Sequence, residues 1–293
     1  MSKSNGYIKI NYYGGYGNQL FIYFMARLYG EKHNLTLITE LKNNYIKLKK
    51  NFIDENIIFD EVLKTYILRD KDYNIEKHEL PYYGKGIYIF DGFFQYEENF
   101  YLNKERILNM VVEKYKTEYY FSIHVRLDDY YLPNNRHLII NSDYYVDCIK
   151  KYGENYEKIY IICDKLNERW EKLYMFKLIN KIKLINKIPI YREQTLMEDI
   201  NSIIKSKYIV ASNSTLCFWA TFFSNAEKII SFPYFGMDIK KNKKIDIWDN
   251  NPQLFKYNKN KNPQLFKYNK NKNIIFNKDY SKNIIDFFEN MIL

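Results

Sequence analysis

The residue types most suited to chemistry lie in residues 121–130, where an apolar run leads into His124, Arg126 and two aspartates. A short, β-branched apolar run bounded by polar residues is typical of a strand buried in a parallel sheet. Polar side chains just past the carboxyl end of such a strand lie where open α/β sheets bind ligands. His124 and Arg126 are two residues apart, so they share a face of an extended strand. There the planar guanidinium could bind a phosphate through two hydrogen bonds, without a metal ion.

A structural role for Arg126 is the alternative. The guanidinium would then form a surface ion pair with Asp128 or Asp129. Exposed pairs of this kind contribute little to stability. This stretch by itself does not separate the two roles, so the elements around it have to be considered.

The opening of the chain predicts a strand over residues 7–13, a glycine-rich turn over residues 14–19 and then a helix. The helix is indicated by apolar residues at helical spacing: Leu20, Phe21, Phe24, Met25 and Leu28. A second strand over residues 35–39 completes a βαβ unit. Glycines let the backbone approach a ligand closely, and the start of a helix offers free N–H groups to an anion. The third glycine of the dinucleotide pattern is missing, so a dinucleotide site is not indicated.

A second turn of this type follows the strand predicted over residues 208–211. It reads Ser212-Asn213-Ser214-Thr215 and opens a helix over residues 216–223. Serine and threonine at this position are typical helix N-caps. The same hydroxyl and N–H groups could hold a phosphate, and capping does not exclude that use.

Apolar runs alternate with helical periodicities along the rest of the chain. In the first half they predict a strand over residues 87–90 and a helix over residues 103–115. In the second half they predict helix 144–151, strand 159–163, helix 168–176, an irregular strand 182–190, helix 194–206 and strand 229–233. Such alternation predicts an α/β protein with parallel sheets, and we place a domain boundary near residue 117.

A metal site is not expected. Asp70 and Asp72 form an Asp-x-Asp that could chelate a divalent ion with a nucleotide diphosphate, but solvated loop charges are the preferred interpretation of the pair. The four histidines show no pairing at ligand spacing. The sequence therefore predicts chemistry without a metal or other cofactor.

The net charge of +10 raises the hypothesis of nucleic-acid binding. Residues 238–272 contain ten lysines and three aspartates, which supply +7 and leave about +3 for the rest of the chain. No aromatic-basic RNA motif accompanies them, so we expect no nucleic-acid partner, although this tail could give peripheral contact with an anionic surface. Within it, residues 251–261 recur unchanged at 262–272, and we expect a duplicated surface loop.

The three cysteines, Cys148, Cys163 and Cys217, are widely spaced and odd in number. This pattern predicts buried apolar thiols, with neither a disulfide framework nor a zinc site. The first strand is predicted within ten residues of Met1, and no apolar run of eighteen residues follows. We therefore expect a cytoplasmic protein.

Four stretches, taken together and in this order, resemble the family 11 glycosyltransferases, the α-1,2-fucosyltransferase family. Residues 14–21 (GGYGNQLF) look like its opening glycine-rich Asn-Gln motif, and residues 91–95 (DGFFQ) resemble its second block. His124-Val125-Arg126 with Asp129-Tyr130 is similar to its His-x-Arg-x-x-Asp-Tyr donor motif. Residues 212–215 followed by Trp219-Ala220 look like its last block, so the resemblance covers residues 7–235.

The resemblance implies a GT-B fold: two Rossmann-like domains, residues 1–117 and 118–293, facing across a cleft with the acceptor largely on the first and the donor on the second. It implies inverting transfer of L-fucose from GDP-fucose to a glycan hydroxyl, the 2-hydroxyl of galactose in this family. Catalytic roles would fall to Arg126, on the β-phosphate, and to Asn18. The donor contacts implied by the motifs are Gly15, Gly17, Asn18, His124, Arg126, Asp199, Asn213, Ser214 and Thr215. Asp91 and Asp129 are candidates for the general base, and an exposed ion pair is the alternative for either.

The chain departs from the family pattern at two positions. Leu127 and Asp128 stand where the family often has a second arginine and a glycine. The match looks like the bacterial or viral form and not the Golgi form. Three other functions stay open: a GT-B transferase for another deoxyhexose, a catalytically inactive nucleotide-sugar-binding module, and nucleic-acid binding through the basic tail.

Overall fold

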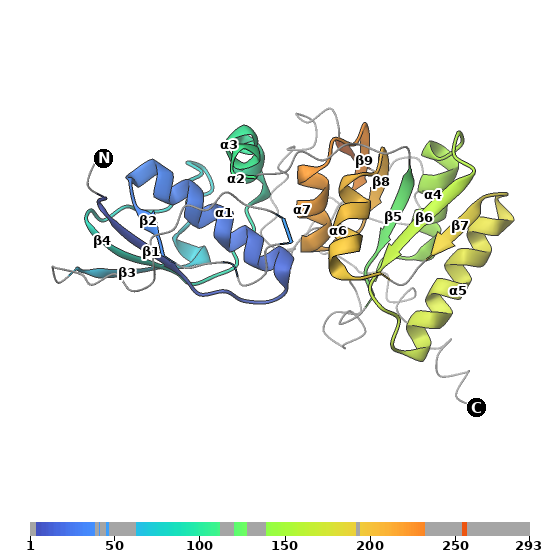
Figure 1. The fold of residues 1–293 in the computed structure, drawn as a ribbon, viewed down its shortest axis with the longest axis horizontal. Helices are drawn as coiled ribbons and strands as arrows, with labels where there is room; N and C mark the ends of the chain where they lie inside the picture. The colour runs from blue at the N-terminus through green and yellow to red at the C-terminus, as the bar shows by residue number, and fades with distance from the viewer. Residues whose placement is uncertain are drawn as a thin grey trace, which may run out of the picture. The chain divides into compact units, whose positions relative to one another are not determined.

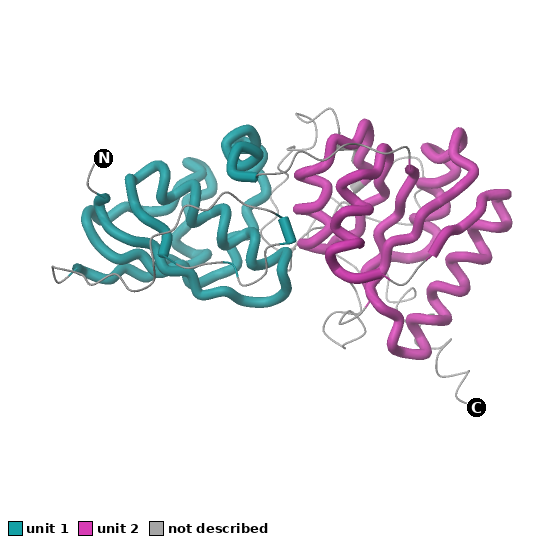
Figure 2. Tube along the Cα trace, in the orientation of Figure 1, with its two compact units in different colours: residues 1–114 teal, residues 115–293 magenta. Residues whose placement is uncertain are grey.

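The computed structural model divides into two compact units, unit 1 (Met1–Lys114) and unit 2 (Tyr115–Leu293) (Figure 2). Each unit carries a parallel β-sheet, which confirms the predicted α/β class. The predicted boundary near residue 117 lies outside the described residues. The structure describes residues 4–38, 41, 45–46, 63–111, 120–127, 139–191, 194–231 and 254–256.

Unit 1 contains a four-stranded sheet in the order β2-β1-β4-β3, and each neighbouring pair is parallel. Its strands are β1 (Gly6–Ile10), β2 (Thr36–Leu37), β3 (Thr65–Leu68) and β4 (Gly86–Phe90) (Figure 1). Its helices are α1 (Tyr16–His33), the 3-10 helix η1 (Asp70–Asp72), α2 (Glu97–Leu102) and α3 (Lys104–Asn109). The core forms around the central strands, where Ile8 of β1 and Tyr88 of β4 are paired in register and fully buried.

Helix α1 is the main packing element of unit 1. Its predicted apolar face is buried, and Leu20, Phe21 and Phe24 are completely inaccessible. The helix begins at Tyr16, four residues earlier than the sequence predicted. Residues 17–19 therefore belong to its first turns and not to a preceding loop. The helix ends at His33 and is capped by Asn34, whose left-handed backbone (φ 54°) is a conformation that asparagine tolerates well.

The helix predicted over residues 103–115 is wrong in its extent. Two short helices, α2 and α3, meet at Asn103, and α3 ends at Asn109. The side-chain amide of Asn103 donates to the carbonyl oxygen of Asn99 (2.8 Å). Asparagine side chains compete with the backbone in this way, which explains a break that apolar spacing alone does not reveal.

Unit 2 contains a six-stranded parallel sheet in the order β10-β9-β8-β5-β6-β7. Its strands are β5 (Phe121–Val125), β6 (Lys158–Cys163), β7 (Ile188–Tyr191), β8 (Tyr208–Ala211), β9 (Lys228–Ser231) and β10 (Leu254–Lys256). Its helices are α4 (Ser142–Tyr152), α5 (Arg169–Leu184), α6 (Leu196–Ile204) and α7 (Thr215–Phe223). Helices α4 and α5 pack together, as do α6 and α7, and the sheet lies between the two pairs (Figure 1).

The irregular strand predicted over residues 182–190 is wrong in its first part. Helix α5 continues to Leu184, and only Ile188–Tyr191 forms a strand. The reason is that Ile182 extends the apolar face of the helix, at helical spacing from Met175 and Leu178, and all three side chains are buried. From the sequence alone, this short apolar run could be assigned either to a helix or to a strand.

The duplicated segment also differs from expectation. Residues 254–256 of its first copy form β10, which pairs in parallel with β9, so the prediction of a loop is wrong there. Leu254 lies opposite Ile229, and Lys256 lies opposite Ser231. The second copy lies outside the described residues.

The three cysteines are free and buried, as predicted. Within the part of the chain that the structure describes, no helix is both long and apolar enough to cross a membrane.

Each sheet contains a point where the strand order reverses. In unit 1 the chain moves outward from β1 to β2 and then returns to place β4 on the other side of β1. In unit 2 it moves outward from β5 through β6 to β7 and then returns to place β8 on the other side of β5. Ligands of open α/β sheets bind at the carboxyl ends of the strands beside such a reversal. The expected sites are therefore the β1/β4 edge of unit 1 and the β5/β8 edge of unit 2.

Candidate functional sites

The β5/β8 edge of unit 2 is bridged by one buried hydrogen bond. Nδ1 of His124, the fourth residue of β5, lies 2.7 Å from Oγ of Ser212, which directly follows β8. Both side chains are almost fully buried. Burial, and then the nearby charge of Arg126, lowers the pKa of His124 to about 3. The imidazole is therefore neutral at physiological pH, so it can recognise a polar ligand group but not neutralise a phosphate.

Arg126 extends from the end of β5 toward the end of β6. Its Nη1 donates to Oδ2 of Asp164 (2.7 Å), and both side chains are about one-quarter exposed. Arg126 thus has an ion-pair partner in Asp164. Asp128 and Asp129, the partners that the sequence suggested, lie outside the described residues. A guanidinium presents five N–H donors, so holding Asp164 and binding an anion are compatible. The pair fixes the arginine at the carboxyl edge of the sheet.

Asp199 lies on α6, whose N-terminus is capped by Thr195. The aspartate is 5% exposed, and within the described residues its Oδ1 has no hydrogen-bond partner. Burial, followed by the charges of Asp164 and Glu198, raises its pKa to about 7. A buried acceptor without a donor is costly in a folded protein and is a candidate ligand contact.

The Ser212-Asn213-Ser214-Thr215 turn connects β8 to α7. Ser214 occupies the N-cap position of α7, but its side chain makes no capping hydrogen bond. The side chains of residues 212–214 are buried at the same edge as His124. The capping role that the sequence predicted for this hydroxyl is therefore not observed. The geometry is compatible with the alternative, in which the hydroxyl and N–H groups of this turn hold a phosphate.

The β1/β4 edge of unit 1 is bridged by more exposed side chains. Gln95, past the end of β4, donates from Nε2 to Oδ1 of Asn18 in α1 (2.9 Å), joining the first two sequence motifs. Gly14 has φ 65°, and a Cβ there would lie 2.4 Å from Nδ2 of Asn18. Gly15 is the N-cap of α1 with no side-chain cap, whereas Gly17 is buried inside the helix. Of these three glycines, Gly14 has the clearest backbone requirement for glycine.

Asp91, directly after β4, is the centre of this edge. Its Oδ1 accepts a hydrogen bond from the Tyr13 hydroxyl and a longer one from Asn11 Nδ2 (3.4 Å), and its Oδ2 pairs with Arg69 Nε (3.2 Å). The hydrogen bond from Tyr13, then that from Asn11, lowers the pKa of Asp91. A carboxylate stabilised in its ionised form is a weak general base. The structure thus favours the ion-pair alternative for Asp91, whereas Asp129 lies outside the described residues.

The Asp-x-Asp of η1 is occupied by backbone contacts. The two carboxylate oxygens of Asp70 accept from the N–H groups of Phe93 (2.9 Å) and Phe94 (2.7 Å), and Asp72 accepts from Arg69 N–H (2.8 Å). Within the described residues, no cluster of three or more His, Cys, Asp or Glu side chains could hold a metal ion. In this structure Asp70 holds the backbone of the loop after β4, and Asp72 holds the backbone at the start of η1.

Sequence reasoning missed three residues at the unit 1 edge: Asn11, Tyr13 and Arg69. The rule that identified His124 and Arg126 could have found them, because Asn11 and Arg69 follow β1 and β3 directly and Tyr13 lies three residues after β1. Asparagine and tyrosine are abundant throughout this chain, so a single residue of either type is a weak signal, and Arg69 beside Asp70 is typical of solvated loop charges.

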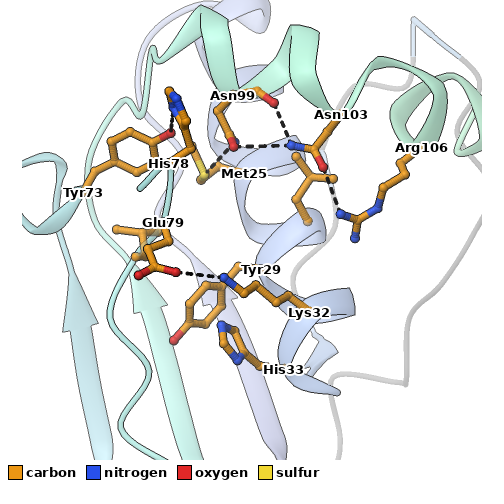
Figure 3. A pocket seen from close by; sticks show the side chains of 12 residues that line it. Met25, Tyr29, Lys32, His33, Tyr73, His78, Glu79, Asn99, Asn103 and Arg106 are labelled. Carbon is orange, nitrogen blue, oxygen red and sulfur yellow. Dashed lines mark hydrogen bonds and ion pairs between the residues drawn. The ribbon is translucent and has the colours of Figure 1, made fainter. Parts of the chain in front are cut away.

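A pocket of about 210 Å³ lies elsewhere in unit 1, around the second half of α1 (Figure 3). Its polar side chains bond to one another: Lys32 pairs with Glu79 (3.0 Å), and the Tyr73 hydroxyl lies 3.4 Å from His78. None of the residues that the sequence singled out for chemistry lines it. Nε2 of His33, which also lines the pocket, is buried and has no hydrogen-bond partner within the described residues. The pocket walls are therefore only partly bonded, and the pocket is not the predicted site.

No family model and no curated protein matches the sequence. Among solved structures, the chain is similar to a crystal structure of POFUT1 in complex with GDP, with a TM-score of 0.47 and 9% sequence identity. The alignment covers 81% of this chain and 100% of that chain. A similarity this low does not establish a shared activity.

Proposed function

We propose that the protein is an inverting glycosyltransferase that moves L-fucose from GDP-fucose to a hydroxyl group of an acceptor glycan, with the 2-hydroxyl of galactose as the expected acceptor position. The observation that carries this proposal is how the four family-like motifs pair. Asn18 of the first motif bonds to Gln95 of the second, 77 residues away. His124 of the third bonds to Ser212 of the fourth, 88 residues away. Both pairs lie at strand-order reversals, where ligands of such sheets bind.

The nucleotide preference is supported by Asp199. Guanine presents two N–H donors on its Watson–Crick edge, and a buried carboxylate whose Oδ1 receives no hydrogen bond from any described residue is a matching acceptor. Uracil and thymine offer a single N–H on that edge. The neutral imidazole of His124 adds a second polar group, without a charge, at the same edge of the sheet.

The phosphate contacts are proposed from charge and helix geometry. Arg126 would hold the β-phosphate, with Asn213, Ser214 and Thr215 at the start of α7 binding phosphate oxygens. Gly15, Gly17 and Asn18 complete the donor contacts that the sequence resemblance implies. In the reaction the acceptor oxygen forms a bond to C1 of fucose as the C1–O bond to the β-phosphate breaks, and the acceptor hydroxyl gives its proton to a general base, for which Asp129 is the candidate. Arg126 stabilises the negative charge that develops on the departing GDP, which is the contribution usually supplied by a metal ion.

A donor screen tests this function. The protein is incubated with GDP-, UDP- and dTDP-sugars and lactose-type acceptors, and nucleotide release and product mass are measured with and without EDTA. We expect GDP-fucose to be used and EDTA to have no effect. Use of a UDP- or dTDP-sugar would contradict the assignment of Asp199 to guanine. Loss of turnover in EDTA that manganese restores would contradict the metal-free mechanism.

Two alternatives correspond to distinct outcomes of the same screen. Transfer from another GDP-deoxyhexose would leave the nucleotide assignment intact and change the sugar. Tight binding of GDP without release of nucleotide from any donor would indicate an inactive binding module.

A further inference from the structure

We infer that the β1/β4 edge of unit 1 is a carbohydrate-binding platform, in which the rings of Tyr13 and Phe93 receive a face of a neutral sugar ring and Asp91 and Arg69 bind its hydroxyl groups. That this sugar is the acceptor rests on the proposed function. The binding site itself does not, because it is built from contacts within unit 1.

The first observation is a pair of exposed aromatic rings at a sheet edge. Tyr13 is 41% exposed and Phe93 is 39% exposed, and their ring centroids are 6.2 Å apart at 56°. Tyr13 follows β1 and Phe93 follows β4, so the rings lie on the two sides of the strand-order reversal. The C–H faces of pyranose rings are apolar, and aromatic rings offer a large contact area with little loss of conformational entropy.

The second observation is the polar set beside the rings. The Asp91 carboxylate accepts from Tyr13, Asn11 and Arg69, and all four side chains are at least partly exposed. A carboxylate beside a guanidinium presents acceptors and donors side by side, as adjacent sugar hydroxyl groups require. Apolar surface with a few convergent polar groups is the usual composition of a small-molecule site. The opposite charges of Asp91 and Arg69 favour a neutral ligand over an ionic one.

The third observation is that the loop carrying Phe93 is strained and clamped. Phe94 has φ 50°, a left-handed conformation that is unfavourable for a non-glycine residue. Asp70 stabilises this turn by accepting from the N–H groups of both Phe93 and Phe94. A Cβ on Gly92 would lie 2.5 Å from Asp70 Oδ2, so the close approach requires glycine. Strain held in place by neighbouring groups is a feature of binding sites, where it fixes a geometry in advance.

Direct binding of sugars tests the platform without turnover. Saturation-transfer NMR is recorded on the full chain with the methyl glycosides of galactose, glucose, mannose, N-acetylglucosamine and rhamnose, with mannitol as an open-chain control. We expect ring-proton signals from at least one glycoside and none from mannitol. Phe93→Ala should weaken that binding roughly tenfold, the scale of one aromatic contact. Tyr83→Ala removes another exposed ring of unit 1, 55% exposed and outside this edge, and should leave binding unchanged.

Binding of no glycoside, equal binding of mannitol, or unchanged binding in Phe93→Ala would overturn the platform. Circular dichroism and GDP affinity check that Phe93→Ala is folded. If sugars bind through Phe93 while no donor is used in the screen above, the platform stands and the proposed function fails. If fucose is transferred and Phe93→Ala changes neither sugar binding nor the acceptor KM, the platform fails and the function stands.

Discussion

The carboxyl edges of the two sheets carry similar side chains in opposite electrostatic states. In unit 1, Asp91 is 25% exposed and ion-paired, and its pKa is lowered. In unit 2, Asp199 is 5% exposed, and its pKa is raised to about 7. The difference arises because burial disfavours the charged form whereas hydrogen-bond donors favour it.

This contrast suggests different ligands for the two edges. The unit 1 edge is partly exposed and its polar groups are already bonded to one another, so a ligand there replaces existing bonds and gains mainly from aromatic contact. At the unit 2 edge His124, Ser212 and Asp199 are buried, and no donor among the described residues reaches Oδ1 of Asp199, so a ligand that supplies one gains the free energy of satisfying it. The unit 1 edge therefore suits a sugar, and the unit 2 edge suits a nucleotide base. The predictions below, from the largest effect to the smallest, test this division.

The largest effect is expected at Arg126. Arg126→Ala should lower kcat by roughly a hundredfold or more, the scale of losing one oxyanion-type donor. Arg126→Lys should have a smaller effect, because lysine keeps the charge but lacks the planar guanidinium that forms two hydrogen bonds to a phosphate. Steady-state kinetics and a thermal melt measure both properties, and the melting temperature should change little because the Asp164 pair is partly exposed.

The control for Arg126 is Arg106→Ala. Arg106 forms an exposed ion pair with Glu31 in unit 1, so its removal should change neither kcat nor KM. If Arg126→Ala unfolds the protein, or leaves transfer intact, then Arg126 is a structural residue and the donor assignment loses its main support.

The second effect concerns Asp199 and pH. Asp199 must be ionised to accept from guanine, so GDP affinity should fall as the pH drops below about 7, by up to about tenfold per pH unit. Asp199→Asn should remove this dependence and weaken GDP binding by about ten- to a hundredfold, since an unmatched buried group costs about 1–3 kcal/mol. Calorimetric titrations between pH 5.5 and 8.5 measure both. Glu154→Gln, at an exposed position of unit 2, is the control.

The same carboxyl predicts a change in stability of the ligand-free protein. A carboxyl group whose folded pKa is raised keeps its proton while the unfolded chain loses it, so stability falls between about pH 4 and pH 7. Asp199→Asn should therefore raise the free energy of unfolding at pH 8 by on the order of 2 kcal/mol. An unchanged or lowered value at pH 8 would contradict the buried state that distinguishes the unit 2 edge.

A smaller effect is expected at Asp70. Asp70→Ala leaves the N–H groups of Phe93 and Phe94 without their acceptor and should destabilise unit 1 by about 1–3 kcal/mol. The acceptor KM should rise about tenfold while GDP affinity stays constant, because the backbone that Asp70 holds carries none of the proposed donor contacts. Asp72→Ala removes one backbone contact in the same short helix and should change KM much less. Equal effects of the two variants on acceptor KM would show that Asp70 has no special positioning role.

The smallest effect is expected from removing one copy of the duplicated segment. Deleting residues 251–261 and deleting residues 262–272 give the same sequence, and the remaining copy supplies an identical Leu-Phe-Lys to pair with β9. Transfer rate and GDP affinity should be unchanged, and stability should change by no more than about 0.5 kcal/mol. A loss of GDP affinity would show that the duplication contributes to the unit 2 edge.

Sequence patterns predicted the elements that position the sites better than the contacts within them. Strand 208–211 and its following turn were predicted correctly, because β-branched residues and a polar turn coincide there. The break at Asn103 and the long α5 were not, because a side-chain bond and a continued apolar face are resolved only by packing. His124 and Arg126 were identified from their place after a strand, but their partners Ser212 and Asp164 depend on which strands become neighbours. The clamp by Asp70 was missed for the same reason, since η1 and the loop after β4 are far apart in sequence.

The most direct test of the division between the two edges is hydrogen–deuterium exchange of the full chain with and without GDP. If GDP binds the unit 2 edge, exchange should slow in peptides that cover residues 121–127 and 212–218, and Asp199→Asn should diminish the protection. Protection confined to unit 1, or no protection at saturating GDP, would contradict the assignment of the nucleotide to unit 2.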